Sequence, residues 1–268
     1  MNDDLLLTID GDSLAHRAYH ALPKSIHLNA IVGFSNFMLR LWEAEQPAAV
    51  LVAWDTLEVE TYRHEALPEY QSGREFEDSI VDQLDQLPEV VESWGFLVAK
   101  ADGYEADDFL AASAAKWKGR VVVATSDRDA FQLVSDRVTV LQPVKGVSEL
   151  ARIGPEQVRE RYGVEPEQVP DFIALRGDSS DKIPGAPGVG PKKAADVLRE
   201  FGTLEHALKA GRFSTIADDL RLYRSIATMD KQAPLPTLKK TTPPDWVSAS
   251  EHAKELGLGG LSRRLAER

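Results

Sequence analysis

The sequence contains no cysteine, which excludes disulfide bonds and cysteine-ligated metal sites. It also lacks any apolar run near the roughly 18 residues that a membrane-spanning helix needs. The N-terminus begins MNDD and then enters a short apolar run, without the positively charged start and long hydrophobic stretch of a signal peptide. We therefore expect a cytoplasmic protein that has no membrane partner.

Acidic residues outnumber basic ones in the whole chain, but the basic residues are unevenly distributed. The 268 residues are 43% hydrophobic and 28% charged, an ordinary globular composition, and their net charge is -12. Taken alone, this charge argues against a nucleic-acid partner. Residues 182–231, however, hold nine Lys and Arg against six Asp and Glu, a net charge of +3. The chain is thus polarised, and an acidic cluster that holds cations would account for much of the negative excess.

Short apolar runs rich in β-branched residues alternate with helical patterns in the first half of the chain. The strand-like runs are 5–10, 48–55, 95–100, 121–126 and 138–144, and the helical patterns are 29–45, 75–94 and 106–117. This alternation predicts an α/β fold whose mostly parallel sheet is flanked by helices. The strand signal fades after about residue 150. We therefore expect an α/β core over 1–160 and a helical region over 161–268.

Acidic residues follow the predicted strands. Asp10 ends the first strand, Asp55 ends the second and Asp127 follows the fourth, with Asp129 two positions later. The segment GYEADDFLAASAAK (103–116) adds three acids where the next helix begins: Glu105, Asp107 and Asp108. Because parallel sheets bind ligands at the carboxyl ends of their strands, these acids should converge at one edge.

Two interpretations of these acids remain open. Each could separately cap a helix or a turn, since acids near a helix start satisfy free N–H groups. Alternatively, they could bind divalent cations together, because converging carboxylates repel one another unless a cation offsets them. Mg²⁺ or Mn²⁺ suits a carboxylate-and-water shell, and two such ions about 4 Å apart catalyse phosphodiester hydrolysis.

A Gly-rich segment stands out in the second half of the chain. GVGPKKAADVLREFG (188–202) predicts a tight turn, a helix that begins at Pro191 and a helix end at Gly202. With the preceding GDSSDKIPG (177–185), it predicts a helix–hairpin–helix over about 170–208. Such a motif grips a DNA backbone through N–H groups at the helix start and reads no bases. The alternative is a simple corner of two helices with exposed lysines.

These motifs resemble the 5′-nuclease (flap endonuclease) family, and most closely the bacterial 5′–3′ exonuclease domain of DNA polymerase I. The resemblance runs from IDGDSLAHRAYHAL to SIATMDKQAPLP, near 225–236. No polymerase-like segment follows, so we expect a free-standing member. The resemblance implies a PIN-like core with a helical arch over about 62–88.

The resemblance also implies a set of site residues. TIDGD, VAWD, YEADD, TSDRD and GDSSD match the metal-binding motifs of the family, and Asp178 and Asp181 enter only through this match. The implied metal ligands, which are also the implied catalytic residues, are Asp10, Asp55, Glu105, Asp107, Asp108, Asp127, Asp129, Asp178 and Asp181. The family assigns the first metal to Asp10, Asp55, Glu105 and Asp107, and the second to Asp127, Asp129, Asp178 and Asp181, with Asp108 close to both.

The implied DNA contacts lie in the arch, the first helix and the hairpin. They are Arg17, Arg63, Tyr70, Arg74, Gly188, Gly190, Lys192 and Lys193. Tyr70 would stack on a base, and the alternative for it is a half-buried packing role. The family usually carries a lysine directly after this tyrosine, whereas this chain has Gln71, which removes one positive charge near the scissile phosphate.

The activity implied by the resemblance is metal-dependent hydrolysis of DNA. The enzyme would act as a 5′–3′ exonuclease and flap endonuclease on 5′-flap, nicked or gapped duplexes, in replication and repair at the bacterial nucleoid. Its cofactors would be two or more Mg²⁺ or Mn²⁺ ions, with K⁺ at the helix–hairpin–helix. We expect a monomer that works beside other replication and repair proteins.

Three other classes of protein share some of these features. IDGDS resembles the start of a haloacid-dehalogenase phosphatase, in which Asp10 would become a covalent aspartyl-phosphate. A branched-DNA-binding protein without catalysis would keep the hairpin, and a metal-dependent assay on a 5′-flap substrate would distinguish it. A PIN-type RNase would share the acidic sheet edge but lack the hairpin module.

Overall fold

One mostly parallel sheet organises the molecule. The computed structural model describes residues 2–56, 59–73, 76–145 and 149–268, and within these ranges six strands pair in the order β3–β2–β1–β4–β5–β6. The strands are β1 (Asn2–Asp10), β2 (Pro47–Ala53), β3 (Leu97–Ala99), β4 (Val121–Ala124), β5 (Val138–Lys145) and β6 (Glu149–Ile153). The five strands expected from the sequence are all present. The sixth strand, β6, was not predicted.

The order of the strands places their carboxyl ends at one edge. β1 lies at the centre, parallel to both neighbours, with Leu7 opposite Val50 of β2 and Val122 of β4. β6 is the edge strand opposite β3, and it runs antiparallel to β5. Most residues of this edge strand are exposed or half-buried. Its sequence, ELARI, therefore needs no apolar run, and this is why the sequence did not predict a strand here.

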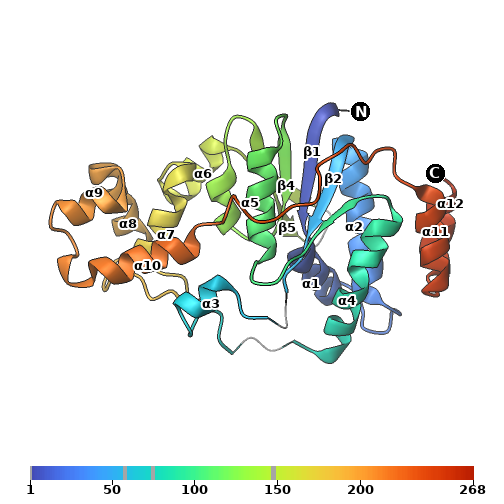
Figure 1. Cartoon of the computed structure of the whole chain (residues 1–268), viewed down its shortest axis with the longest axis horizontal. Coiled ribbons are helices and arrows are strands. Elements are labelled where there is room, and N and C mark those ends of the chain that lie inside the picture. The colour runs from blue at the N-terminus through green and yellow to red at the C-terminus, as the bar shows by residue number, and fades with distance from the viewer. Residues whose placement is uncertain (1, 57–58, 74–75, 146–148) are drawn as a thin grey trace.

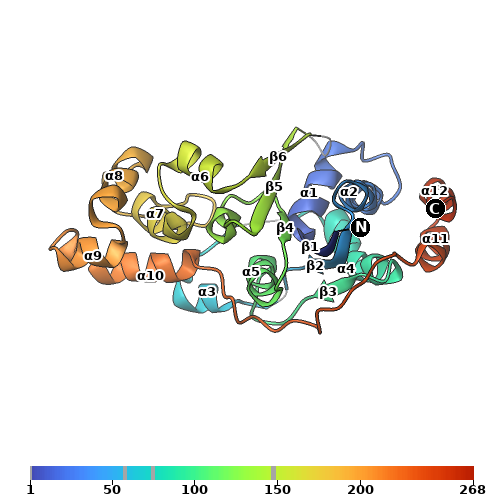
Figure 2. The same ribbon diagram turned by 90° about the horizontal axis from the view of Figure 1, so that it is seen from above.

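The two faces of the sheet belong to two separate hydrophobic clusters. Alternate residues of β1 point to opposite faces, so that Leu6 joins one cluster while Leu7 and Ile9 join the other. Helices α1 (Gly11–Ala21), α2 (Asn29–Glu45) and α4 (Asp78–Ser93) cover the second face. Helix α5 (Ala106–Lys116) covers the first, and Figure 2 shows α5 and α2 on opposite sides of the strands. Burial on both faces explains the continuously apolar strands.

A helical end continues from the sheet on the β5–β6 side. It contains α6 (Pro155–Tyr162), α7 (Val169–Arg176), α8 (Pro191–Phe201), α9 (Leu204–Lys209) and α10 (Ala217–Ala227). Buried residues of α7, α8 and α10 join the same cluster as α5, so this end and the sheet share a core. Figure 1 shows the helical end on the left, with the short helix α3 (Tyr62–Ala66) below the sheet.

The C-terminal segment leaves the helical end and returns to the sheet. Thr241 accepts a hydrogen bond from Val50 N at 2.8 Å, beside β2. Helices α11 (Trp246–Glu255) and α12 (Gly259–Ala266) then pack near α4, at the opposite end of the molecule from α7–α10 (Figure 1). The stretch 161–268 is therefore not one spatial unit, and the division of the chain at residue 160 stays a prediction.

The predicted arch segment forms two elements in the structure. Helix α3 and a turn lead into α4, whose buried residues Ile80 and Leu84 pack on the body of the molecule. Residues 74–75, between these elements, lie outside the described ranges. The structure therefore leaves the arch itself a prediction. None of the helices in the described ranges has the length and apolar composition that a membrane span requires.

Candidate active site at the carboxyl edge of the sheet

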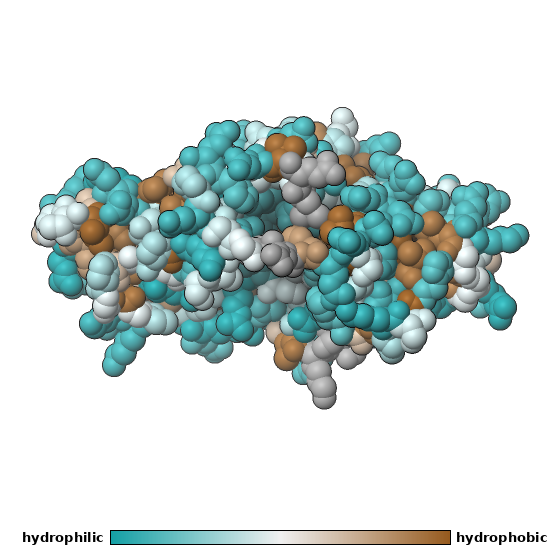
Figure 3. All heavy atoms as spheres, turned by 90° about the horizontal axis from the view of Figure 1, so that it is seen from below, coloured by the Kyte–Doolittle hydropathy of each residue, from teal (hydrophilic) through white to brown (hydrophobic). Residues whose placement is uncertain are grey.

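Acidic side chains from distant segments line one cavity of about 640 Å³ at the carboxyl ends of the strands, which is the lower edge of the sheet in Figure 1. Eight of the nine predicted acids belong to it: Asp10, Asp55, Glu105, Asp107, Asp127, Asp129, Asp178 and Asp181. Seen from this side, the surface is mostly hydrophilic, with scattered hydrophobic side chains (Figure 3). The convergence expected from a parallel sheet therefore occurs, and the 177–185 loop joins it.

Helix starts hold the first of these carboxylates in place. Asp10 caps α1 by accepting a hydrogen bond from Ser13 N at 3.0 Å, and it accepts a second from Thr125 Oγ1 at 2.6 Å. Asp55 accepts one from Ala106 N, at the start of α5, at 2.7 Å. The capping interpretation is therefore correct for these two acids, and the same bonds aim them at the cavity.

One cavity acid was not predicted. Asp12, in the first turn of α1, lines the cavity and accepts a hydrogen bond from Asp55 N at 2.7 Å. Burial, followed by the charge of Asp55, raises its pKa well above the usual range. The sequence could have indicated Asp12, because it is the second acid of IDGD. An acid at the end of a strand and one in the first turn of the next helix can reach the same edge of the sheet.

Crowding changes the protonation of the carboxylates. Burial raises the pKa of Asp10 to about 7, and the carboxylates of Asp55 and Asp127 contribute to the shift. Burial also raises the pKa of Glu105 to about 7, with Asp55 adding to the shift and Arg63 opposing it. These acids therefore lose their charge readily unless a cation stabilises the ionised form.

The repulsion divides the acids into two overlapping groups. Burial and then the charges of Asp127 and Asp10 raise the pKa of Asp107 well above its usual range. For Asp129, burial acts first, followed by Asp127, Asp181 and Asp178. The charge of Asp127 thus contributes to the pKa shifts in both groups.

The donor set fits divalent cations. It consists of carboxylate oxygens, which are the ligands that Mg²⁺ and Mn²⁺ prefer, and cations would relieve the repulsion that raises these pKa values. Within the described residues, no three of these acids are already gathered around a single point in ligand geometry.

Asp108, the ninth predicted acid, lies elsewhere. Its side chain is fully buried and forms two hydrogen bonds with the guanidinium group of Arg63, at 2.7 and 2.8 Å. It also accepts hydrogen bonds from Tyr62 Oη at 3.1 Å and Asp230 N at 2.7 Å. The structure therefore does not bring Asp108 into the cavity, because its oxygens are used inside the protein.

The two arch residues expected to contact DNA are buried as well. Arg63 is 3% exposed, and its Nε donates to Ile226 O at 2.9 Å, so its donors are directed at protein atoms rather than at a phosphate. Tyr70 is 4% exposed and donates to Glu105 Oε2 at 3.1 Å. The structure thus gives Tyr70 the packing role that was its alternative, and neither side chain faces the surface.

Gln71 is the cavity residue that departs from the family pattern. Its Nε2 donates to Tyr70 Oη at 2.8 Å and to Asp181 Oδ1 at 3.1 Å. Its backbone is left-handed, with φ of 49°, and its N–H donates to Asp181 O at 3.3 Å. A neutral amide therefore connects α3 and its turn to the acidic loop, where the family usually has a cation.

The remaining predicted DNA contacts lie at the surface or at the hairpin. Arg17 is half-buried on α1, while Arg74 lies outside the described residues. Gly188 adopts a positive φ of 71°, which favours glycine, and Gly190 precedes the first turn of α8. The two lysines Lys192 and Lys193 are exposed in that turn, and Lys193 Nζ donates to Gly188 O at 2.8 Å.

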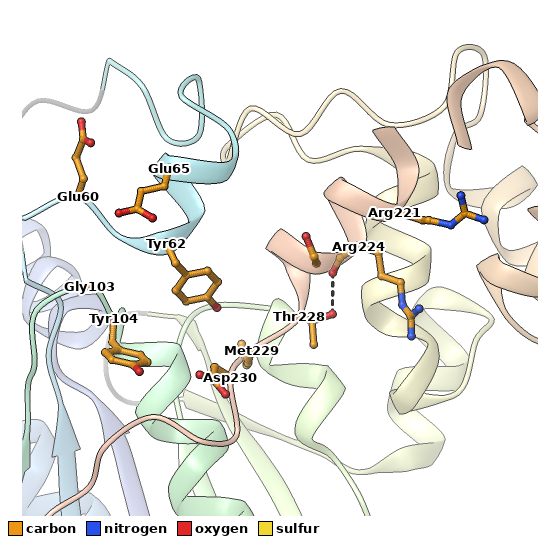
Figure 4. A pocket seen from close by; sticks show the side chains of 11 residues that line it. Glu60, Tyr62, Glu65, Gly103, Tyr104, Arg221, Arg224, Thr228, Met229 and Asp230 are labelled. Carbon is orange, nitrogen blue, oxygen red and sulfur yellow. Dashed lines mark hydrogen bonds between the residues drawn. The ribbon is translucent and has the colours of Figure 1, made fainter. Parts of the chain in front are cut away.

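A second cavity, of about 830 Å³, is lined in part by Tyr62 and Asp230, whose Oη and N–H donate to Asp108. Figure 4 shows its lining, with Tyr62 at the start of α3 and the arginines of α10 across from it. These arginines already form ion pairs, Arg221 with an acid of α9 at 3.0 Å and Arg224 with an acid of α7 at 2.8 Å. Because acids offset both cations, this cavity has little attraction for a phosphate.

Sequence comparison identifies the class of protein. The family profile described as 5'-3' exonuclease, N-terminal resolvase-like domain, matches residues 5–163, and the one described as 5'-3' exonuclease, C-terminal SAM fold, matches residues 164–247. The chain therefore belongs to the 5′–3′ exonuclease family.

Named relatives are bacterial DNA polymerases. DNA polymerase I of Mycobacterium tuberculosis (strain ATCC 25618 / H37Rv) is 46% identical over 210 residues, covering 74% of this chain and 23% of the relative. DNA polymerase I of Bacillus subtilis (strain 168) is 35% identical over 288 aligned residues, covering 98% of this chain and 32% of the relative. The chain thus spans only about a quarter to a third of the length of these relatives.

Solved structures share the fold. A bacteriophage T5 5'-exonuclease with bound zinc ions superimposes with a TM-score of 0.71 at 20% identity, covering 98% of each chain. The catalytic core of Rad2 in complex with a DNA substrate gives 0.62 at 17% identity, covering 99% of this chain and 91% of the other. At these identities, the similarity establishes the fold alone.

Proposed function

We propose that this protein is a structure-specific 5′ nuclease, a 5′–3′ exonuclease and flap endonuclease that hydrolyses DNA phosphodiesters near 5′ ends or flap junctions. The observation that carries the proposal is the convergence of eight family-matched carboxylates on one cavity, from the ends of β1, β2 and β4, the start of α5 and the 177–185 loop. A role in replication and repair, in the cytoplasm and as a monomer, belongs to the same proposal.

The cavity residues would bind two divalent cations, Mg²⁺ or Mn²⁺. Asp10, Asp55, Glu105 and Asp107 would hold one ion, and Asp127, Asp129, Asp178 and Asp181 the other. When bound, such ions activate a water molecule and stabilise the departing oxygen. The hydrogen bonds from Ser13 N and Ala106 N restrain the first carboxylates before any ligand arrives, which lowers the cost of assembling the site.

DNA would be held at a distance from the cavity by the helix–hairpin–helix. The hairpin before α8 exposes N–H groups of a helix start beside two lysines, an arrangement that suits phosphates and carries no base specificity. Backbone carbonyls of the same hairpin are the proposed K⁺ ligands. A structural neighbour supports a DNA partner, since the catalytic core of Rad2 is in complex with a DNA substrate.

Cleavage of a 5′-flap duplex tests the proposal. We expect 5′-phosphorylated products from flap, nicked and gapped DNA with Mg²⁺ or Mn²⁺, and none when EDTA removes the ions. Mapping the cleavage sites on a labelled substrate measures this, with a covalently closed circular duplex, which has no 5′ end, as a control. Absence of cleavage with every divalent ion, despite DNA binding, would contradict the enzyme assignment and favour the non-catalytic alternative.

Restoring the family cation should accelerate the reaction. Gln71→Lys places an ammonium group between Tyr70 and Asp181, where it offsets carboxylate repulsion and attracts the phosphate. We expect the single-turnover rate on a 5′-flap to rise roughly tenfold, which corresponds to about 1.4 kcal/mol. Gln86→Lys, on α4 and away from the cavity lining, adds the same charge and serves as the control. A lower rate for Gln71→Lys than for the control would show that the amide is the adapted group here.

A further inference from the structure

A third cavity, of about 660 Å³, is lined by three arginines from three separate elements. Arg17 comes from α1, Arg128 from the loop after β4 and Arg161 from the last turn of α6. The other described lining residues are Ser126, Gln142, Pro143, Val144 and Tyr162, and none of the described residues that line it is acidic. In a chain of net charge -12, this concentration of guanidinium groups marks a site for an anion.

Two arginines of this cavity, Arg128 and Arg161, differ from the many arginines of the described residues that form ion pairs. Among the described residues, neither Arg128 nor Arg161 forms an ion pair, whereas Arg159, two residues before Arg161, pairs with Glu165 at 2.8 Å. Arg161 is held by neutral groups. Its Nη1 donates to Gln142 Oε1 at 2.6 Å, and its guanidinium carbon lies 5.7 Å from the centre of the Phe131 ring. The side chain is therefore positioned while its charge stays uncompensated.

This arginine cavity adjoins the carboxylate cavity. Ser126, Arg128 and Tyr162 line both of them, and Arg128 stands in the sequence between Asp127 and Asp129. A nucleic-acid strand whose scissile phosphate lies at the acids would therefore place a neighbouring phosphate among the guanidinium groups. A planar guanidinium group forms paired hydrogen bonds with phosphate oxygens, and this geometry suits it to the task.

We propose that Arg17, Arg128 and Arg161 form a phosphate subsite that holds a phosphate of the DNA strand next to the one being cleaved. The proposal rests on the proposed nuclease function and adds the assignment of Arg128 and Arg161. The subsite attracts the strand toward a cavity whose carboxylates would otherwise repel it. Its ligand is a phosphate group, either one within the backbone or the 5′-terminal monoester.

Binding measurements on the full chain test the subsite without relying on cleavage. Dissociation constants for a 5′-flap duplex are measured in EDTA at several salt concentrations, for the parent protein, Arg161→Ala and Arg17→Ala. We expect each substitution to weaken binding roughly tenfold and to reduce the salt slope by about 0.7–0.9. Arg161→Lys, which keeps the charge but loses the planar fork, should recover part of the affinity and most of the slope.

Arg159→Ala is the matched control, because it removes the same charge from the same helix at a residue already paired with Glu165. The subsite proposal would be overturned if Arg161→Ala and Arg17→Ala bound the flap duplex with the same affinity and the same salt slope as this control. If the parent also cleaves flaps, the nuclease proposal survives that result. If the parent neither binds nor cleaves DNA, both proposals fail.

The same measurement on substrates with and without a 5′-phosphate separates the two sources of the phosphate. If the subsite holds the 5′-terminal phosphate, the parent protein binds the 5′-hydroxyl substrate more weakly than the 5′-phosphate substrate. The arginine variants then bind both substrates with the same affinity. If it holds a backbone phosphate, the parent binds both substrates equally and the variants are weak on both. Either pattern supports the subsite.

Discussion

Replacing Asp107 with asparagine should lower the cleavage rate of a 5′-flap by on the order of 10²–10³-fold while leaving the folded protein as stable as the parent, or more so. Asp107 lines the cavity, and burial together with Asp127 and Asp10 raises its pKa well above the usual range. Its charge is therefore unfavourable to the folded chain in the absence of cations. Asparagine keeps the shape and removes one charge from the metal-binding set.

The two readouts distinguish this role from a structural one. Single-turnover cleavage with Mg²⁺ measures the catalytic loss, and thermal unfolding in EDTA measures stability without bound ions. Asp102→Asn removes an exposed acid from the preceding loop and should alter neither quantity. Affinity for flap DNA in EDTA should not fall, since less negative charge faces the phosphates. A variant that cleaves at the rate of the Asp102→Asn control would exclude Asp107 from the cation site.

The convergence of the acids could be predicted because it depends on topology. Parallel strands bring their carboxyl ends to one edge whatever their separation in sequence, so the positions of Asp10, Asp55 and Asp127 follow once the strands are recognised. The acids of the 177–185 loop could not be placed in this way. Their approach depends on how α7 packs against the short helical segment Asp129–Leu133 that follows β4, and only the family resemblance indicated them.

The acids at the start of α5 show where sequence reasoning fails. Consecutive residues of an α-helix point about 100° apart, so Asp107 and Asp108 point in different directions. Asp107 lines it, while Asp108 turns to Arg63 and also accepts a hydrogen bond from Glu105 N at 3.3 Å. The sequence supplies the acids but not the partner of each, because Arg63 arrives from a separate helix.

The burial of Arg63 and Tyr70 could not be read from the sequence for a similar reason. Both residue types commonly contact nucleic acids. Arg63 lies on α3, which is only five residues long and too short for a periodic pattern to reveal its buried side, and Tyr70 lies in the turn that follows α3. Its burial comes from contacts with distant segments, such as the hydrogen bond from Arg63 Nε to Ile226 O at 2.9 Å. Tertiary packing therefore decides between a DNA contact and a structural role.

Arg63→Ala should destabilise the protein by about 3–5 kcal/mol, because it leaves the carboxylate of Asp108 buried without its cation. At about 2–4 °C per kcal/mol for a chain of this size, the unfolding midpoint should fall by roughly 6–20 °C. The pair lies at the junction of α3, α5 and the end of α10, so these elements should loosen together. Differential scanning calorimetry of parent and variant measures the loss.

A double variant separates burial of a charge from loss of packing. In Arg63→Met with Asp108→Asn, methionine fills much of the space, and the amide oxygen still accepts hydrogen bonds from Tyr62 Oη and Asp230 N. The variant buries no unpaired charge at position 108, but the new amide NH2 has no acceptor and Glu105 N loses its hydrogen bond to the second oxygen. We therefore expect the double variant to regain about half of the lost stability. If Arg63→Ala instead melted like the parent and lost DNA affinity, Arg63 would be a phosphate contact, as the family resemblance implied, and its buried pairing with Asp108 would not describe the protein in solution.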